Sequence, residues 1–507
     1  MLFNSYVFIF AFLPIAVLGF FGTARWAGDR AAMLWLIAAS IFFYAYWRLT
    51  YVPLLAAVMV FTFLVGQRLA ARPSKPLLAF GIVVVLGVLA YFKYAGFILA
   101  NFDRLSGGDY QLGRIVLPLA ISFFTFQKIA FLVDSQKGLT KGVRFRDFTL
   151  FVIFFPQLIA GPIVHWREVV PQFALPETFR PRAENFAQGL SFFVIGLFKK
   201  AVLADGIATY ATPMFGAAAT GAHPDLVTAW GGALSYTFQI YFDFSGYSDM
   251  ALGAALLFGI SLPFNFNSPY QAKNIIDFWR RWHMTLSRFL RDYLYIALGG
   301  NRRGTTRRYV NLFTTMLLGG LWHGAGWQFL VWGALHGGYL TINNMWQAVV
   351  PRTLAVTRGY RAFAWALTFL VVIIAWVPFR AANLPTAERI LSGMTGGNGV
   401  ELPIAFADKF GPLTTVLRHA GVGFNLNGGK TVVLTWVWIV ALFIITRFLP
   451  NTQRLIKQFR PALDYSQTTR HRIAWHPNLA WAWAMAAIAV AGVLSLAQVS
   501  EFLYFQF

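Results

Sequence analysis

One histidine of this sequence lies where a proton acceptor could act. His323 stands inside LLGGLWHGAGWQFLVWGALHGGYL (317–340), an apolar segment that carries no charged residue and has glycines on both sides of the histidine. Glycines allow a second backbone or a ligand to approach closely, and they permit a helix to break. A lone histidine in an apolar segment is most often a packed core residue. The small glycines around His323 instead leave room for a substrate. An imidazole has a pKa of ordinarily about 6.5, so a neutral His323 could accept a proton from a hydroxyl group.

The other histidines carry weaker signals. His336 follows His323 by 13 residues. On one continuous helix the two side chains would point in different directions, so we interpret His336 as a packing or supporting residue. No carboxylate stands three or four residues from His283, His323 or His336, so their spacing gives a metal site no support. The remaining histidines, which we interpret as loop or interface residues, are His165, His223, His419, His471 and His476.

Two carboxylates also lie inside apolar sequence, Asp243 and Asp249 in YFDFSGYSDMALG (241–253). Carboxylates at membrane depth usually face a cavity or pair with a cation. Two roles stay open: the pair could line a polar path, or it could brace arginines of segment 280–291. Neither residue has an obvious proton-transfer partner in the sequence, and this favours bracing.

Segment 264–304 carries too many charges to cross lipid as one exposed helix. At about 100° per residue, the aromatic and leucine side chains between 278 and 293 share one face of a helix, with His283 at its edge. The arginines on the opposite side are Arg280, Arg281, Arg288 and Arg291. This pattern predicts an amphipathic helix at the membrane interface, or a segment that enters the membrane and returns. The arginines could bind the phosphates of a donor or contact lipid headgroups.

The composition of the chain indicates that these segments belong to a membrane protein. Of 507 residues, 58% are hydrophobic and only 12% are charged, whereas soluble chains are about one-quarter charged. Apolar runs of about 20 residues recur between positions 4 and 499, and they predict about 11 transmembrane helices. The composition excludes a soluble enzyme and a disordered tail. Because there is no cysteine, it also excludes a disulfide scaffold, a cysteine-bound metal and a cysteine acyl-enzyme.

The basic residues predict an orientation. The net charge is +23, but lysines and arginines gather in short clusters at the ends of apolar runs, which favours positive-inside topology over nucleic-acid binding. Loops 67–76 and 136–147 are basic, so we expect them in the cytoplasm and the N-terminus outside. The long loop 379–431 is then extracytoplasmic. We expect one membrane domain, residues 1–507, without internal repeats or a soluble domain.

Four motifs make the sequence resemble the membrane-bound O-acyltransferase family, in particular its bacterial branch that includes the membrane subunit for alginate O-acetylation. They are IAGPIVHWREVVPQF (159–173), YFDFSGYSDMALG (241–253), the segment 265–304, and LWHGAGWQFLVWGALHG (321–337). The opening FNSYVFIFAFLP (3–14) and the closing FLYFQF (502–507) also fit, so the resemblance extends over the whole chain.

The resemblance implies an all-α polytopic protein, with re-entrant or amphipathic helices around a central tunnel. By the match at LWHG, His323 is the family's catalytic histidine. His283, in RRWHMTLS, is the second functional histidine of the bacterial branch. The implied donor is acetyl-CoA from the cytoplasm, used as a substrate, with no bound cofactor. The implied acceptor is a secreted polysaccharide such as alginate, acetylated with a separate extracytoplasmic acetyltransferase partner at the bacterial inner membrane.

Acyl transfer from a thioester needs a base for the acceptor hydroxyl and a hydrogen-bond donor for the developing oxyanion. We expect His323 to be the base, assisted by His283, while His283, arginines or backbone N–H groups could supply the donor. The main alternative is an exporter or transporter component without transferase chemistry, which inverted repeats and paired broken helices would indicate. A further alternative is the same fold acting on cellulose, peptidoglycan, teichoic acid, lipid or protein hydroxyls.

Overall fold

The computed structural model describes residues 1–497 and 503, apart from 111, 114, 160, 426–428, 457–461 and 464–472. His471 and most of the closing motif 502–507 therefore lie outside the described residues, as does position 160 of the first motif. The described chain is mainly helical, as its composition predicts. Two short strands, β1 (Val400–Pro403) and β2 (Val422–Asn425), pair in parallel.

The helices follow one another through the whole described chain. The first half contains α1 (Leu13–Ala27), α2 (Asp29–Ala45), α3 (Val52–Ala71), α4 (Lys75–Ser106), α5 (Ile121–Gln136), α6 (Phe145–Ile153), α7 (Phe155–Leu158), α8 (Trp166–Val169), α9 (Ala183–Phe198), α10 (Asp205–Ala219) and α11 (Leu226–Leu257). The second half contains α12 (Ile275–Trp279), α13 (Met284–Phe289), α14 (Gly304–His323), α15 (Trp327–Val349), α16 (Arg352–Ala355), α17 (Arg358–Arg380), α18 (Leu384–Met394), α19 (Ala405–Phe410), α20 (Pro412–His419), α21 (Gly429–Phe448), α22 (Thr452–Leu455) and α23 (Leu479–Leu494).

Six helical segments of the described chain are long and apolar enough to cross a membrane. They are Phe8–Ala27, Leu49–Ala71, Lys75–Ser106, Arg358–Arg380, Gly429–Phe448 and Leu479–Ala497. The prediction of about 11 crossings also counts shorter or more polar helices such as α2, α5, α9, α11, α14 and α15, and that larger number stays a prediction.

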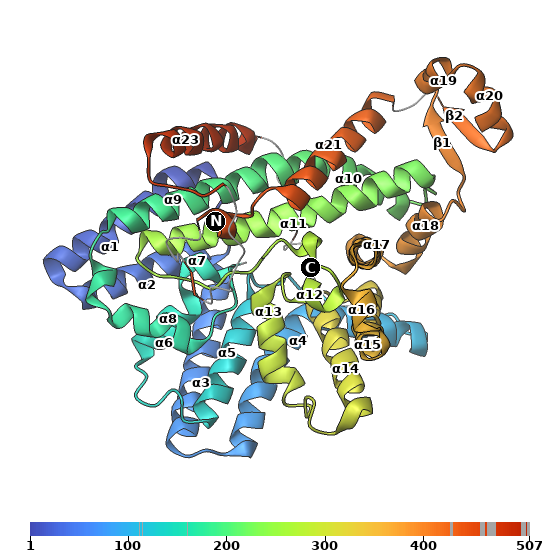
Figure 1. Ribbon diagram of the computed structural model, residues 1–507. Helices are drawn as coiled ribbons and strands as arrows, with labels where there is room; N and C mark the ends of the chain where they lie inside the picture. The colour runs from blue at the N-terminus through green and yellow to red at the C-terminus, as the bar shows by residue number, and fades with distance from the viewer. Residues whose placement is uncertain are drawn as a thin grey trace.

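Helix α11 forms the centre of the molecule and is buried along most of its length. It runs beside α9 and α10 across the upper part of Figure 1, while α3, α4, α5, α13, α14 and α15 lie below. Glycines permit the close packing of α9 on α11: a Cβ atom added to Gly196 would lie 2.5 Å from the carbonyl oxygen of Gly246. Small residues of this kind let two membrane helices approach along their backbones.

Segment 264–304 does not form the single amphipathic helix that its periodicity predicts. Helix α12 ends at Trp279, and α13 begins after His283, whose backbone has φ +42° and ψ +54°. This left-handed conformation cannot continue a right-handed helix, so the residues on either side of it do not share one face. The next turn, Leu290–Tyr295, is a π-helix. The re-entrant version of the prediction describes this broken segment better.

The predicted loop 379–431 contains structure of its own. After α17, the chain forms α18, the two strands, and the short helices α19 and α20 between them. In Figure 1 the strands and these two short helices extend away from the helical body at the upper right. The side of the membrane on which they lie stays a prediction.

Candidate active site around His323 and His283

His323 is the last residue of α14 and is buried. The helix stops there because GAG (324–326) follows, and α15 begins at Trp327. Two side chains of α4 bind the exposed carbonyl end of α14. The Lys93 ammonium donates to the carbonyl oxygens of Trp322, at 2.5 Å, and of His323, at 3.0 Å, and the Tyr94 hydroxyl donates to that of Leu321 at 2.7 Å. A cation at a helix C-terminus also interacts favourably with the helix dipole.

Lys93 and Tyr94 were not singled out in the sequence, although a signal was present. Lys93 is a charged residue inside the apolar run 77–100, and an ionisable residue at membrane depth is a functional candidate. Its partners could not be read from the sequence, because they lie about 230 residues further along the chain.

Aromatic rings surround the imidazole of His323. The rings of Trp322, Trp332 and Phe379 lie 4.8–5.1 Å from it, centroid to centroid. His323 also lines an enclosed cavity of about 10 Å³ together with Asp243, a volume on the scale of a single water molecule. The surroundings are therefore largely apolar and exclude bulk water.

His283 lies in the same aromatic cluster. Its ring contacts Phe244 at 4.7 Å, and Phe244 lines the small cavity of His323. It also lies 6.4 Å from the ring of Trp322, the neighbour of His323 in sequence. The Nδ1 atom of His283 is hydrogen-bonded to the Asn265 Oδ1 atom at 3.0 Å, whereas Nε2 has no hydrogen-bond partner within the described part of the chain. Burial lowers the pKa of His283, which lies between α12 and α13, to about 3, so the ring is neutral.

His336 lies closer to His323 than continuous helical geometry would place it. Because the chain reverses at the glycines after His323, α15 packs back against α14, and both imidazoles contact the ring of Trp332, at 5.1 and 4.8 Å. The Trp279 Nε1–H group donates to the His336 Nδ1 atom at 3.2 Å. His336 is thus packed in the aromatic cluster next to the candidate base.

Asp243 and Asp249 do pair with cations, but not with arginines of segment 280–291. The Lys200 ammonium lies 2.7 Å from Asp243 and 2.6 Å from Asp205, and Lys199 lies 2.6 Å from Asp249. Both lysines stand in the π-helical stretch Lys199–Ala204 that joins α9 to α10. The prediction that these carboxylates brace arginines of segment 280–291 is therefore wrong: their partners are lysines. The close packing of α9 on α11 places these lysines next to the carboxylates.

The four predicted arginines line one open cleft of about 910 Å³, together with Lys273 and Arg308. The arginine side chains in this cleft differ in their partners. Arg281 pairs with Asp277 at 2.8 Å, and Arg291 pairs with Asp292 at 2.7 Å. The hydrogen bond to Asp292 raises the pKa of Arg291. Arg280 is exposed and has no carboxylate partner among the described residues.

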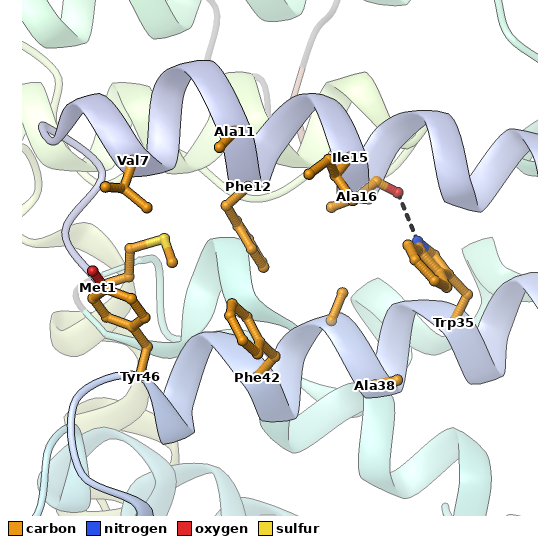
Figure 2. Close-up of a pocket in the computed structure, with 11 residues that line it drawn as sticks. Met1, Val7, Ala11, Phe12, Ile15, Ala16, Trp35, Ala38, Phe42 and Tyr46 are labelled. Atoms are coloured by element: carbon orange, nitrogen blue, oxygen red, sulfur yellow. Dashed lines mark hydrogen bonds between the residues drawn. The ribbon is translucent and has the colours of Figure 1, made fainter.

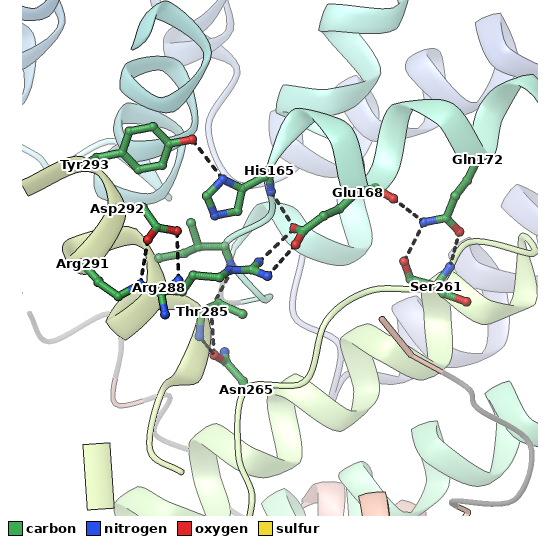
Figure 3. Close-up of polar contacts among 11 residues, drawn as sticks. His165, Glu168, Gln172, Ser261, Asn265, Thr285, Arg288, Arg291, Asp292 and Tyr293 are labelled. Carbon is green, nitrogen blue, oxygen red and sulfur yellow. Dashed lines mark hydrogen bonds and ion pairs between the residues drawn. The ribbon is translucent and has the colours of Figure 1, made fainter. Parts of the chain in front are cut away.

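Arg288 belongs to a polar network that joins the cleft to the motif 159–173 (Figure 3). Its guanidinium group binds Glu168 through two contacts of 2.5 and 2.9 Å. The backbone N–H of His165 donates to the same carboxylate, and the His165 ring bonds to the Tyr293 hydroxyl at 2.9 Å. His165, predicted to be a loop or interface residue, therefore helps to hold α8 against the π-helical turn that follows α13.

Trp279 and Thr285 separate the basic cleft from the two histidines. Both residues line the cleft. Trp279 also packs against Trp332, which contacts His323, and Thr285 binds Asn265, which holds His283. By these contacts, two side chains lie between a molecule in the cleft and each histidine: Trp279 and Trp332 before His323, and Thr285 and Asn265 before His283. A second cavity, of about 430 Å³, lies between α1 and α2 and is lined by apolar side chains such as Phe12, Phe42 and Trp35 (Figure 2). It contains no histidine, carboxylate, lysine or arginine side chain.

Fold and site together define a polytopic helical membrane enzyme. Its two buried histidines lie in an aromatic cluster, and Trp279 and Thr285 separate this cluster from a basic cleft. The sequence model of the membrane-bound O-acyltransferase family matches residues 142–382, a range that includes every histidine and arginine of the candidate site. The described residues contain no group of three or more acidic or histidine side chains that could hold a metal ion.

Known relatives agree with that match. Over 432 residues the chain is 44% identical to a Helicobacter pylori protein named peptidoglycan O-acetyltransferase, covering 79% of this chain and 81% of the relative. It is 44% identical over 407 residues to the probable alginate O-acetylase AlgI of Pseudomonas aeruginosa, covering 78% and 75%. A teichoic acid D-alanyltransferase of Streptococcus thermophilus is 31% identical over 238 residues, covering 45% and 57%. The chain belongs to the membrane-bound O-acyltransferase family: it is a multi-pass membrane protein and an O-acyltransferase that uses an acyl donor.

Proposed function

We propose that this protein takes an acetyl group from cytoplasmic acetyl-CoA and transfers it across the membrane for O-acetylation of a secreted polysaccharide such as alginate. The observation that carries the proposal is the position of His323 and His283 in one apolar, aromatic cluster, two side chains from an open basic cleft. A base without bulk water on one side and a cationic cleft on the other suit a thioester donor that carries phosphates.

In the proposed step, His323 accepts the proton of the acceptor hydroxyl while the hydroxyl oxygen forms a bond to the thioester carbonyl carbon. The carbon–sulfur bond then breaks, and the proton passes from His323 to the departing thiolate. The products are an acetate ester and the free thiol of coenzyme A. No proton is gained or lost overall, so one buried base that shuttles the proton is sufficient.

The basic cleft is the proposed site of the coenzyme A phosphates. Four of its five arginines are those predicted from the sequence: Arg280, Arg281, Arg288 and Arg291. Arg280 carries the most weight in this proposal, because it is exposed and unpaired among the described residues, while Arg288 is held by Glu168. Planar guanidinium groups bind phosphate through paired hydrogen bonds. The ion pair of Asp243 with Lys200 keeps a charge near His323 compensated and so supports the apolar surroundings of the base.

The acceptor and the cellular setting belong to the same proposal. We infer a single membrane domain over residues 1–507, in the bacterial inner membrane with its N-terminus outside, as the basic loops favour. Relatives named for alginate and for peptidoglycan support an extracytoplasmic glycan as acceptor. A separate extracytoplasmic acetyltransferase completes the transfer: the hydroxyl acetylated at His323 belongs to this partner, which then passes the acetyl group to the glycan. Acetylation of peptidoglycan is the second candidate, favoured by the name of the Helicobacter pylori relative.

The test uses membranes that contain the wild-type protein, His323→Ala or His419→Ala, with radiolabelled acetyl-CoA, secreted polysaccharide and periplasmic extract. His419 is an exposed histidine of α20 and serves as the matched control. Equal insertion of the three proteins is checked by immunoblot. We expect the wild type and His419→Ala to label the glycan and His323→Ala to lose at least about 100-fold of the activity.

Two other outcomes overturn parts of the proposal. Equal labelling by His323→Ala would make His323 a structural residue and refute the mechanism. Absence of labelling by all three proteins, while secretion of the polymer still depends on the chain, would favour an exporter component.

A further inference from the structure

A chain of hydrogen bonds leads from a backbone amide to His283. The N–H group of Ile163 donates to the Thr285 Oγ1 atom at 3.0 Å. A backbone amide can only donate, so the Thr285 hydroxyl accepts there and its own hydrogen is free to point elsewhere. That hydroxyl lies 2.8 Å from the Asn265 Oδ1 atom, to which it donates, and the backbone N–H of Thr285 points to the same oxygen at 3.4 Å. The contact between Thr285 and Asn265 is visible in Figure 3.

These donors determine which way the Asn265 amide faces. The backbone N–H of Thr285 can only donate, so the atom that it faces must be the carbonyl oxygen, since an NH₂ group there would oppose donor to donor. The NH₂ group then faces Ser248, whose Oγ atom lies 3.3 Å away. The His283 Nδ1 atom also lies 3.0 Å from the carbonyl oxygen. Because that oxygen only accepts, Nδ1 must carry a hydrogen.

The backbone around His283 aims the ring. The backbone N–H of Met284 donates to the main-chain carbonyl oxygen of Asn265 at 2.9 Å. The main chain and the side chain of Asn265 therefore both bind this turn. A left-handed conformation at a residue other than glycine is strained and persists only where the surroundings hold it. The Nε2 atom of His283 is buried and unpartnered within the described residues. In a neutral ring with a hydrogen on Nδ1, this atom offers a lone pair.

We propose that Asn265 is a positioning residue that fixes His283 as the Nδ1–H tautomer, so that His283 Nε2 acts as a hydrogen-bond acceptor in the reaction centre and not as the oxyanion donor. The catalytic part of this inference rests on the proposed function. It removes one of the three donors that the sequence left open for the oxyanion. Before the reaction, His283 can orient the acceptor hydroxyl by accepting its hydrogen bond; that single hydrogen then turns to His323, which takes the proton.

His336 provides an internal contrast. The Nε1–H group of Trp279 can only donate, so the His336 Nδ1 atom accepts it and the hydrogen of the neutral ring lies on Nε2. The two buried histidines therefore carry opposite tautomers. A single spectrum of the same protein can report both, which makes His336 the reference for His283.

The first test is nitrogen NMR of the full chain in detergent micelles, with ¹⁵N-labelled histidine and His283→Gln and His336→Gln to assign the signals. We expect a protonated Nδ1 and an unprotonated Nε2 for His283, and the reverse for His336. Asn265→Leu should release the tautomer of His283 and leave His336 unchanged, whereas Asn265→Asp keeps an acceptor and should keep the Nδ1–H form. A protonated Nε2 on His283 in the wild type would overturn the inference, and this result does not depend on the folding of Asn265→Leu.

The second test compares kcat and KM in the acetyl-transfer assay. We expect kcat of Asn265→Leu to fall roughly 100-fold with the KM for acetyl-CoA unchanged, and Asn265→Asp to restore most of it. Asn267→Ala is the matched control, because its side chain faces Asn451 and not His283. Wild-type kcat in Asn265→Leu would overturn the inference and leave the proposed function intact. A wild type that transfers no acetyl group but shows the expected tautomer would refute the proposed function alone.

Discussion

Lys93→Met tests whether the end of α14 must be held for His323 to work. The ammonium group of Lys93 donates to two carbonyl oxygens, of Trp322 and of His323, at 2.5 and 3.0 Å. A hydrogen bond to a charged group contributes about 1.5–3 kcal/mol, so the loss of both costs about 3 kcal/mol or more. The free carbonyls also let the last turn of α14 shift. A displacement of about 1 Å in a reacting group can lower the rate about 100-fold.

The assay measures acetyl transfer and thermal unfolding on the same purified protein in detergent. We expect Lys93→Met to lower both kcat and Tm, and Lys93→Arg, which keeps a charged donor, to recover a large part of each. Tyr94→Phe is the matched control: it removes a single neutral hydrogen bond, to Leu321, from the same helix end and should cost about 1 kcal/mol. If Lys93→Met lowers Tm but retains wild-type kcat, the hydrogen bonds of Lys93 to the end of α14 stabilise the fold only. The idea that they position His323 for the reaction is then refuted.

Three further perturbations follow from the geometry. Arg280→Ala should raise the KM for acetyl-CoA severalfold at constant kcat, with a smaller effect at high salt because exposed charges are screened; an unchanged KM at low salt would remove Arg280 from the donor site. Lys200→Met leaves two buried carboxylates without their cation and should reduce stability by about 3–5 kcal/mol, measured as loss of folded protein in a detergent melt. Gly333→Ala places a Cβ atom 2.6 Å from the carbonyl oxygen of Met316 and should lower Tm by separating α14 from α15. Gly338→Ala, with open space around it, should leave Tm unchanged. Equal Tm values for these two variants would contradict the close packing.

Local signals in the sequence determined the class of the protein and identified the polar residues that lie inside its apolar segments. Apolar runs and clustered basic residues depend on composition over about 20 residues, which is why membrane insertion can be predicted from them. The glycines beside His323 likewise predict a break in the helix, and α14 ends there. The family motifs pointed to His323 and His283 as a pair, and the two rings do lie in one aromatic cluster.

Tertiary packing decided the partners of these groups. The cation next to Asp243 is Lys200, on a neighbouring helix, and not an arginine of segment 280–291. His336 approaches His323 because the chain reverses after α14, although 13 residues on a continuous helix would direct it elsewhere. A periodicity of charges predicted one helix where His283 adopts a left-handed turn. Contacts between residues distant in sequence depend on how whole helices pack, and no pattern within a few turns of one helix carries that information.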